Sequence, residues 1–185
     1  LIGRILEQAG YKVGWTSTLN FKIGEQEWMN KTKMTMLGRF ALQKMLSDMV
    51  KAGCKYAIVE TSSEGIKQYR HIGIKYDVAV FTNLTPEHIE AHGGFENYKK
   101  AKGELFKNSK IHVINGDDQH AEYFLQFPAY KKVVYGIEGR GQSFAKGLSS
   151  SVLAHNAQVV ATGSQFKVNG VEFKLRLLGE FNVYN

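Results

Sequence analysis

Short apolar segments alternate with amphipathic ones along most of the chain, and this order constrains the fold more than any other feature. Tyr56 to Glu60 and Tyr76 to Thr82 are almost continuously apolar, which is typical of parallel strands covered on both faces. Between such segments, apolar residues recur at helical spacing, as they do from Leu42 to Met49. The alternation predicts an α/β fold with a doubly wound, mostly parallel sheet and helices on both faces.

The remaining elements follow from the same periodicities. We expect helices over residues 1–9, 95–106 and 118–127, strands over residues 11–18, 111–114 and 133–135, and a hairpin over residues 21–28. From Val152 to Leu178 the pattern changes to short strands, and Asn169-Gly170 between two of them is a strong hairpin signal. Residues 1–185 are therefore expected to form one domain, with an α/β core at 1–142 and a small antiparallel sheet at 143–185.

Composition excludes several classes of protein. The 185 residues are 43% hydrophobic, enough for one core, yet the longest apolar runs, such as Val78 to Phe81, are too short to span a bilayer. A single cysteine, Cys54, and the lack of a secretory signal indicate the cytoplasm. The net charge of +7 suits anionic partners. Because the lysines are dispersed, we expect neither nucleic acid nor a membrane as a partner.

Polar side chains follow several of the predicted strands, where open parallel sheets bind their ligands. The rim of the sheet is expected to carry Glu60 to Ser63, Thr82-Asn83, Asn115 to Asp118, and a loop with His88 and His92. Glu60 and His88 are candidate metal ligands, and a carboxylate with an imidazole suits zinc or manganese as readily as magnesium. The alternative is that His88 is an ordinary hydrogen-bonded histidine at the end of a strand.

Lys102 shares one helical stripe with Phe95, Tyr98 and Leu105, so a charged side chain lies on an apolar face. One interpretation is a lysine whose ammonium reaches water along that face. The other is a lysine that burial keeps in its neutral amine form. A neutral amine can react with carbon dioxide to give a carbamate, an anion that can bind a cation. The sequence pattern favours the first interpretation.

Three ordered motifs give the chain a resemblance to a known family. Val59 to Arg70 contains a Glu, two serines, a Gln and an Arg in the family spacing, and Asp77 to His88 precedes His92-Gly93 and Tyr98 to Phe106. The third motif is Gly179 to Asn185. Together they resemble the central ATPase domain of the Mur ligases, and most closely the ligase that adds the third residue. The match covers nearly the whole chain.

The resemblance implies roles for individual residues. Glu60 and His88 match magnesium ligands, and Lys102 matches a carbamylated lysine that holds a second magnesium ion; these three are the implied catalytic residues. The implied nucleotide contacts are Asn83, Asn182 and Asn185. The implied contacts to the muramoyl-peptide substrate are Thr35, Ser62, Gln68 and Arg70. Two positions depart from the family pattern, which usually has a second Thr where Met36 stands and often a His where Glu64 stands.

The resemblance also implies a reaction. With ATP and Mg²⁺ as cofactors, the family phosphorylates the D-Glu carboxylate of UDP-N-acetylmuramoyl-L-Ala-D-Glu. The amine of an incoming amino acid then attacks the acyl phosphate and forms an amide. Positioning and charge neutralisation dominate such chemistry. The enzyme is expected to be a monomer, and the sequence leaves open whether the third residue is diaminopimelate or lysine.

The phosphate-binding loop of the family, G-x-x-x-x-G-K-S/T, does not occur in the 185 residues. In the family this loop immediately precedes the helix that begins at Leu1, and separate domains grip UDP and select the amino acid. We therefore expect this fragment alone to be inactive. Two alternatives remain: a related ligase of the folylpolyglutamate or cyanophycin type, or a non-catalytic binding domain that has lost its phosphate loop.

Overall fold

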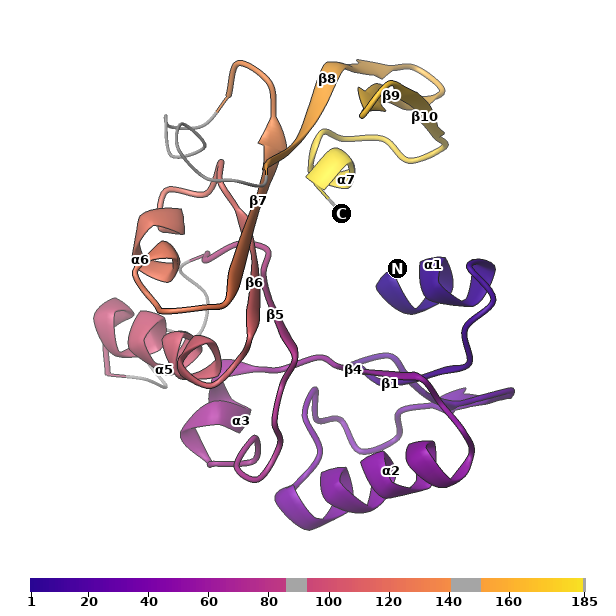
Figure 1. The fold of residues 1–185 in the computed structure, drawn as a ribbon, viewed down its shortest axis with the longest axis vertical. Coiled ribbons are helices and arrows are strands. Elements are labelled where there is room, and N and C mark those ends of the chain that lie inside the picture. Colours follow the sequence, from indigo (N-terminus) through magenta and orange to yellow (C-terminus); the bar gives the residue numbers. More distant parts are fainter. Residues whose placement is uncertain (86–92, 141–150, 185) are drawn as a thin grey trace. The chain divides into compact units, whose positions relative to one another are not determined.

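The computed structural model describes residues 1–85, 93–140 and 151–184. The chain forms two compact units (Figure 1). The first contains Leu1–Ile74 and Glu90–Lys102, and the second contains Lys75–Ile89 and Gly103–Asn185. The domain boundary expected after residue 142 falls outside the described residues and stays a prediction.

A four-stranded mixed sheet forms the first unit. Its strands are β1 (Val13–Thr16), β2 (Asn20–Ile23), β3 (Gln26–Met29) and β4 (Tyr56–Val59), in the order β3-β2-β1-β4. The expected hairpin is confirmed, because β2 pairs with β3 antiparallel and Gly24 turns the chain with φ of 56°. On the other side, β1 pairs with β4 in parallel.

Helices α1 (Ile2–Gln8) and α2 (Arg39–Lys51) cover opposite faces of this sheet (Figure 1). The alternation of side chains along β1 explains the arrangement. Gly14 faces α2, and a Cβ there would lie 2.6 Å from Met49; Trp15 faces α1, where a Cβ on Gly3 would lie 2.6 Å from the indole. At each contact a glycine leaves room for one large side chain, Gly14 for Met49 and Gly3 for Trp15, so both helices pack closely against the sheet.

A buried charge also holds α1 in place. Lys22 on β2 is only 5% exposed, and its Nζ lies 3.0 Å from Glu7 Oε1 and 3.8 Å from Glu27 Oε2. The same Nζ lies 5.4 Å from the centroid of the Trp15 ring. Because burial of an unpaired ammonium is costly, Lys22 ties α1 to the β2–β3 hairpin through the carboxylates of Glu7 and Glu27.

A six-stranded sheet forms the second unit, in the order β10-β9-β8-β7-β6-β5. The strands are β5 (Val78–Phe81), β6 (Ile111–Asn115), β7 (Lys131–Ile137), β8 (Ser151–Val160), β9 (Gly163–Val168) and β10 (Val171–Leu175). From β5 to β8 the pairing is parallel, and from β8 to β10 it is antiparallel. The predicted α/β class with a mostly parallel sheet is confirmed, and the antiparallel strands extend the same sheet.

The predicted hairpin at Asn169-Gly170 is present between β9 and β10. Val168 pairs with Val171, and the two turn residues have φ of 49° and 80°. Positive φ at both central positions is what a two-residue turn of this kind requires, and asparagine and glycine tolerate it. This local requirement is the reason that the sequence alone predicts the turn.

Among the described residues, three helices accompany the second sheet: α6 (Ala121–Leu125), α7 (Phe181–Tyr184) and α5 (Phe95–Lys107), which runs from the first unit into the second. Phe124 of α6 is fully buried and stacks on Phe81 of β5, with ring centroids 3.9 Å apart. The ring centroid of Phe106 on α5 lies 5.0 Å from that of Phe124. Helix α7 lies on the opposite side of β7 from α6 (Figure 1).

The prediction that the apolar strands are covered on both faces is wrong for β5. Ala79 and Phe81 are buried, but Val78 is 45% exposed and Val80 is 37% exposed. Successive side chains of a strand point to opposite faces, so one face of β5 is covered and the other is open. Tyr56 of β4 is likewise 39% exposed. Each of these strands is the edge of its sheet, a position that an apolar run does not reveal.

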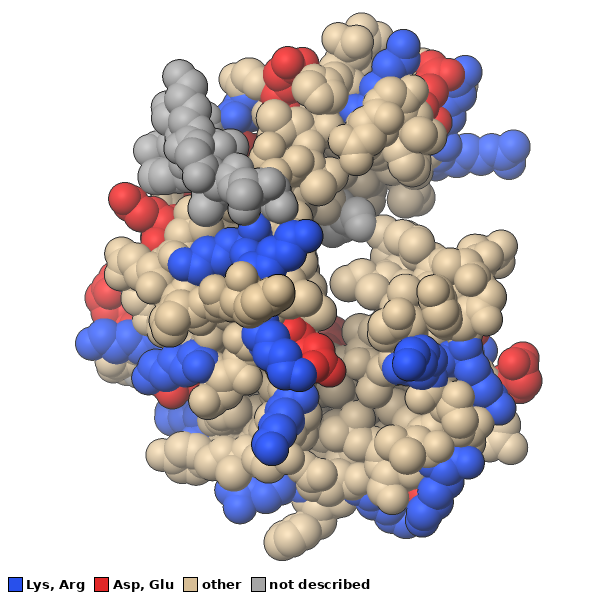
Figure 2. All heavy atoms as spheres, viewed as in Figure 1, with Lys and Arg blue, Asp and Glu red and all other residues tan. Residues whose placement is uncertain are grey.

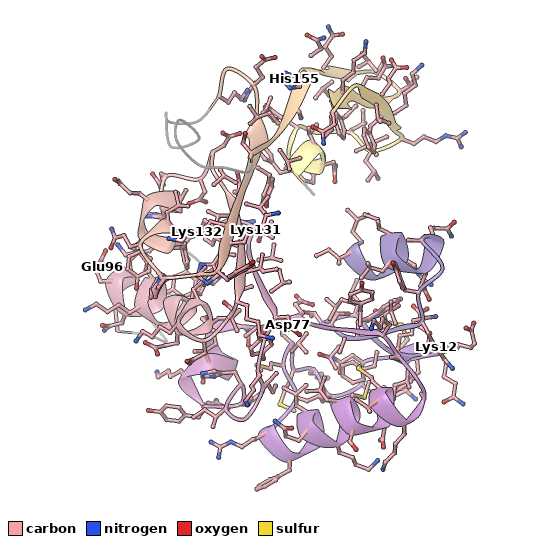
Figure 3. All side chains as sticks on the ribbon, viewed as in Figure 1. Lys12, Asp77, Glu96, Lys131, Lys132 and His155 are labelled. Carbon is pink, nitrogen blue, oxygen red and sulfur yellow. The ribbon has the colours of Figure 1, made fainter. Side chains whose placement is uncertain are left out.

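Charged side chains lie at the amino ends of the parallel strands of the second sheet. Asp77 precedes β5 and pairs with Lys110 at 2.7 Å, and Lys131 and Lys132 begin β7, at the amino ends of these strands (Figure 3). Basic and acidic side chains intermingle on the visible face (Figure 2). In the described part of the chain, no helix has the length and hydropathy needed to cross a membrane.

Candidate functional site

Glu60 lies immediately after β4, where the site was predicted, and its carboxylate is held by one residue. The backbone N–H of Thr18 donates to Glu60 Oε2 at 2.8 Å, and the Thr18 hydroxyl donates to Glu60 Oε1 at 3.0 Å. Thr18 follows β1, the parallel neighbour of β4, and Thr16 is in register with Val59. The carboxyl ends of two paired strands therefore meet at Glu60.

Thr35, in the loop before α2, joins the same cluster. The Thr18 Oγ1 lies 3.1 Å from the Thr35 Oγ1. A hydroxyl group has one proton. When Thr18 donates its proton to the Glu60 carboxylate, Thr35 must donate to Thr18. The structure thus brings together Glu60, an implied metal ligand, and Thr35, an implied substrate contact.

Met36 does not take the place of the second hydroxyl that the family usually has. Its side chain is fully buried and belongs to the core cluster with Phe21 and Leu42. A Cβ on Gly65 of α3 (Ser63–Lys67) would lie 2.6 Å from the Met36 sulfur. The loop that carries Thr35 is therefore anchored in the core by its next residue.

Ser62, Gln68 and Arg70 lie around α3 and support one another. The Ser62 hydroxyl caps the helix by accepting from the Gly65 N–H at 3.1 Å. At the other end, Arg70 donates to Gln68 Oε1 and to the Met36 carbonyl. These bonds tie the segment after β4 to the loop of Thr35, and so join all four implied substrate contacts in one unit.

Glu64 and Tyr69 complete this segment. Gln68 Nε2 donates to Glu64 Oε1 at 2.6 Å, which gives the unusual Glu64 a structural role. Tyr69 adopts φ of 57°, and the amides of Tyr69 and Arg70 donate to Ile66 and Gly65. This is the hydrogen-bond pattern of a helix end that normally uses glycine. The left-handed residue reverses the chain so that the side chains of Gln68 and Arg70 meet.

Lys102 lies on α5 as its stripe predicted. Its side chain is half-buried, and the Nζ lies 5.1 Å from the centroid of the Tyr98 ring, which is 4% exposed. An ammonium over an aromatic face is favourable. His88 lies outside the described residues, so its approach to Glu60 and Lys102 stays a prediction.

In the second unit, Asn83 follows β5 and lies between two anchored neighbours. Asn115 Nδ2 donates to the Thr82 carbonyl at 2.8 Å, and the Leu84 N–H donates to Asp118 Oδ2 at 3.0 Å. Asn83 itself is exposed. On α7, Asn182 Nδ2 donates to the Leu178 carbonyl at 2.8 Å. Asn185 lies outside the described residues.

The described residues fit part of a magnesium site. Glu60 with the hydroxyls of Thr18 and Thr35 presents hard oxygen donors, which Mg²⁺ prefers, and such sites commonly use one or two carboxylates with several waters. Across residues 1–85, 93–140 and 151–184, no group of three or more His, Cys, Asp or Glu side chains could hold a metal ion. The further protein ligands that the family resemblance implies are His88 and a carbamate on Lys102.

The search for strand-end residues in the sequence missed Thr18. The rule that found Glu60 applies equally to Thr18, because the predicted strand over residues 11–18 ends there. Glu64 gave no such signal, because its role depends on the turn that brings Gln68 back to the helix.

In each unit, polar side chains gather at the carboxyl ends of parallel strands, the place where open sheets of α/β domains bind their ligands. The family described as the Mur ligase middle domain matches residues 1–185, and the chain belongs to that family. The resemblance seen in the three sequence motifs is therefore confirmed.

Comparisons with individual proteins support the family assignment. The chain is 34% identical over 195 residues to UDP-N-acetylmuramoyl-L-alanyl-D-glutamate--2,6-diaminopimelate ligase of Halalkalibacterium halodurans, covering 100% of this chain and 38% of that protein. Against ligase 1 of that name from Clostridium acetobutylicum, it is 35% identical over 185 residues, covering 98% and 36%. A solved structure of a ligase of that name matches with a TM-score of 0.78 and 27% identity, covering 99% of this chain and 37% of that one.

Proposed function

We propose that the whole protein to which this chain belongs is an ATP-dependent ligase of peptidoglycan synthesis. It adds diaminopimelate, as the third amino acid, to UDP-N-acetylmuramoyl-L-Ala-D-Glu. The observation that carries the proposal is the hydroxyl–carboxylate cluster of Thr35, Thr18 and Glu60, which joins a candidate metal ligand to a candidate substrate contact. The two relatives at 34% and 35% identity carry the name of a diaminopimelate ligase, which favours this amino acid over lysine.

The reaction has two steps. An oxygen of the D-Glu carboxylate attacks the γ-phosphorus of ATP, the bond to the β-phosphate oxygen breaks, and ADP leaves. The amine nitrogen of the incoming amino acid then attacks the acyl carbon. Phosphate leaves with the bonding electron pair, the nitrogen loses a proton, and an amide remains. The first step joins two anionic groups and the second needs the uncharged amine beside the acyl carbon, so holding the reactants in position accounts for much of the rate.

The residues of this chain would have three roles. Thr35, Ser62, Gln68 and Arg70 would bind the muramoyl-peptide, and Arg70 is held in place beforehand by its bonds to Gln68 and Met36. Asn83, Asn182 and Asn185 would bind the nucleotide. Glu60 and His88 would hold one Mg²⁺, and a carbamate on Lys102 would hold a second. Bound there, the ions would supply positive charge that stabilises the phosphate and carboxylate oxygens.

The test uses the full-length protein, because the chain spans only 38% of the relative's length and contains no phosphate-binding loop. The purified enzyme is given ATP, UDP-N-acetylmuramoyl-L-Ala-D-Glu and either diaminopimelate or lysine, with release of ADP and product mass as readouts. We expect ATP-dependent product with diaminopimelate. Product with lysine alone would correct the amino acid.

Two further arms separate the alternatives. Ligation of glutamate to a folate, in place of the muramoyl-peptide, would assign the protein to the folylpolyglutamate type. If none of the acceptors that are tried leads to release of ADP, the proposed reaction is refuted. If the enzyme does not bind ATP, the binding-domain alternative is favoured. Glu60→Gln should lose activity, while Glu25→Gln in the exposed β2–β3 turn is the matched control. We expect the enzyme to be cytoplasmic and to be a monomer, and size-exclusion chromatography with light scattering checks the oligomeric state.

A further inference from the structure

Two adjacent aspartates after β6 send their carboxylates to different segments of the second unit. Asp117 Oδ2 accepts from the Tyr184 hydroxyl at 2.9 Å and from the Ile137 N–H at 2.7 Å. Asp118 Oδ2 accepts from the Leu84 N–H at 3.0 Å. One turn therefore connects to α7, to the end of β7 and to the segment that follows β5.

The turn is built to hold these carboxylates. Asn115 uses both ends of its amide, since Nδ2 donates to the Thr82 carbonyl at 2.8 Å and Oδ1 accepts from the Asp117 N–H at 3.0 Å. A Cβ on Gly136 of β7 would lie 2.8 Å from the Asp117 carboxylate. Only glycine leaves room there, so the close approach of Asp117 to β7 is a feature of the fold.

Tyr184 is a dependable donor for this carboxylate. Burial raises its pKa above the usual range, and the hydrogen bond to Asp117 raises it further, so the phenol keeps its proton at physiological pH. Hydrogen bonds to an ionised acceptor are stronger than those between neutral groups. A second link lies nearby, because Arg140 after β7 pairs with Glu180 before α7 at 2.6 Å.

We propose that Asp117 and Asp118 are positioning residues for the nucleotide, an inference that rests on the proposed ATP-dependent function. Asp118 fixes Leu84, the neighbour of Asn83, and Asp117 fixes Tyr184 on the short helix that carries Asn182. Neither aspartate needs to touch ATP. Together they hold two candidate nucleotide-binding segments on the same strand end, and thus set the distance between them.

The cleanest test is Tyr184→Phe in the full-length enzyme, because it removes one donor and leaves both aspartates in place. Losing a hydrogen bond to a charged group is expected to raise the Kd and KM for ATP about tenfold. The KM for the muramoyl-peptide should change less than about twofold. The preference for ATP over GTP should also fall, because α7 carries Asn182, which the family resemblance implies to approach the adenine. Tyr130→Phe, at a tyrosine that is 94% exposed, is the control.

The outcomes are distinguishable. Unchanged ATP affinity and unchanged nucleotide preference in Tyr184→Phe would overturn the inference, and so would an equal rise in the KM of every substrate, which indicates a general structural defect. Asp118→Ala should likewise weaken the binding of ATP and leave the KM for the muramoyl-peptide nearly unchanged. Calorimetric titration with ATP separates the two proposals: a wild-type enzyme that binds ATP but does not ligate refutes only the reaction. A wild-type enzyme that does not bind ATP refutes both.

Discussion

Replacing Thr18 by Val tests whether the Glu60 carboxylate is positioned by its neighbour. The change removes the hydroxyl that lies 3.0 Å from Glu60 Oε1 and 3.1 Å from the Thr35 Oγ1, and keeps the backbone bond at 2.8 Å. A hydrogen bond to a charged group contributes about 1.5–3 kcal/mol. Thr18 and Glu60 are exposed, so we take the lower end, about 1.5 kcal/mol, which is roughly a tenfold effect.

The assay is ligation by the full-length enzyme at varied Mg²⁺ and varied muramoyl-peptide. We expect Thr18→Val to need more Mg²⁺ and more muramoyl-peptide to reach half of its maximal rate, and kcat/KM to fall roughly tenfold. The unfolding free energy should stay within about 0.5 kcal/mol of the wild-type value. Thr18→Ser restores the hydroxyl and should recover most of the activity. Wild-type kinetics in Thr18→Val, or equal losses in the Ser and Val variants, would refute the reasoning.

Three further changes test the fold. Tyr69→Gly should stabilise the protein by about 1 kcal/mol in urea unfolding, because Tyr69 holds a left-handed φ of 57° that glycine adopts freely; lower stability would mean that its side chain packs usefully. Gly136→Ala should destabilise by about 1–3 kcal/mol, since its Cβ would meet the Asp117 carboxylate, and an unchanged melting temperature would contradict that. The hydrogen bond from Lys22 lowers the pKa of Glu7 from 4.5, so the stability from this pair is present above that pH and is lost as pH falls through the lowered pKa. Lys22→Met should reduce that acid dependence in pH-dependent melting, because only Arg4 then pairs with Glu7, and a variant with the wild-type profile would refute the assignment.

Local features of the fold could be predicted from the sequence. The hairpin at Asn169-Gly170 and the helix ends at Gly10 and Gly53 depend on residues that tolerate positive φ, and each has it here. The exposure of Val78 and Val80 could not be predicted. It depends on which strand lies at the edge of a sheet, and that is decided by pairing between distant segments.

The candidate site shows the same division. Glu60, and in principle Thr18, can be found because parallel strands present their carboxyl ends to ligands. The bond between Asp117 and Tyr184 joins residues 67 positions apart, and no periodicity connects them. The buried position of Met36 was equally hidden, because the family usually has a threonine there and the packing of Met36 with Phe21, Leu42 and Gly65 is visible only in the fold. The roles of all the candidate site residues stay predictions, and His88 and Asn185 lie outside the described residues.

The hydroxyl chain at Glu60 has a direction, and the direction selects what can bind beside it. An ionised Glu60 accepts a hydrogen bond from the Thr18 hydroxyl, and Thr18 in turn accepts one from the Thr35 hydroxyl. Thr35 then has only lone pairs left to offer. A ligand that meets Thr35 must therefore bring its own N–H or O–H, as a peptide amide or a sugar hydroxyl does. A carboxylate or phosphate oxygen arriving there would face another acceptor, so anionic groups are turned away from this hydroxyl.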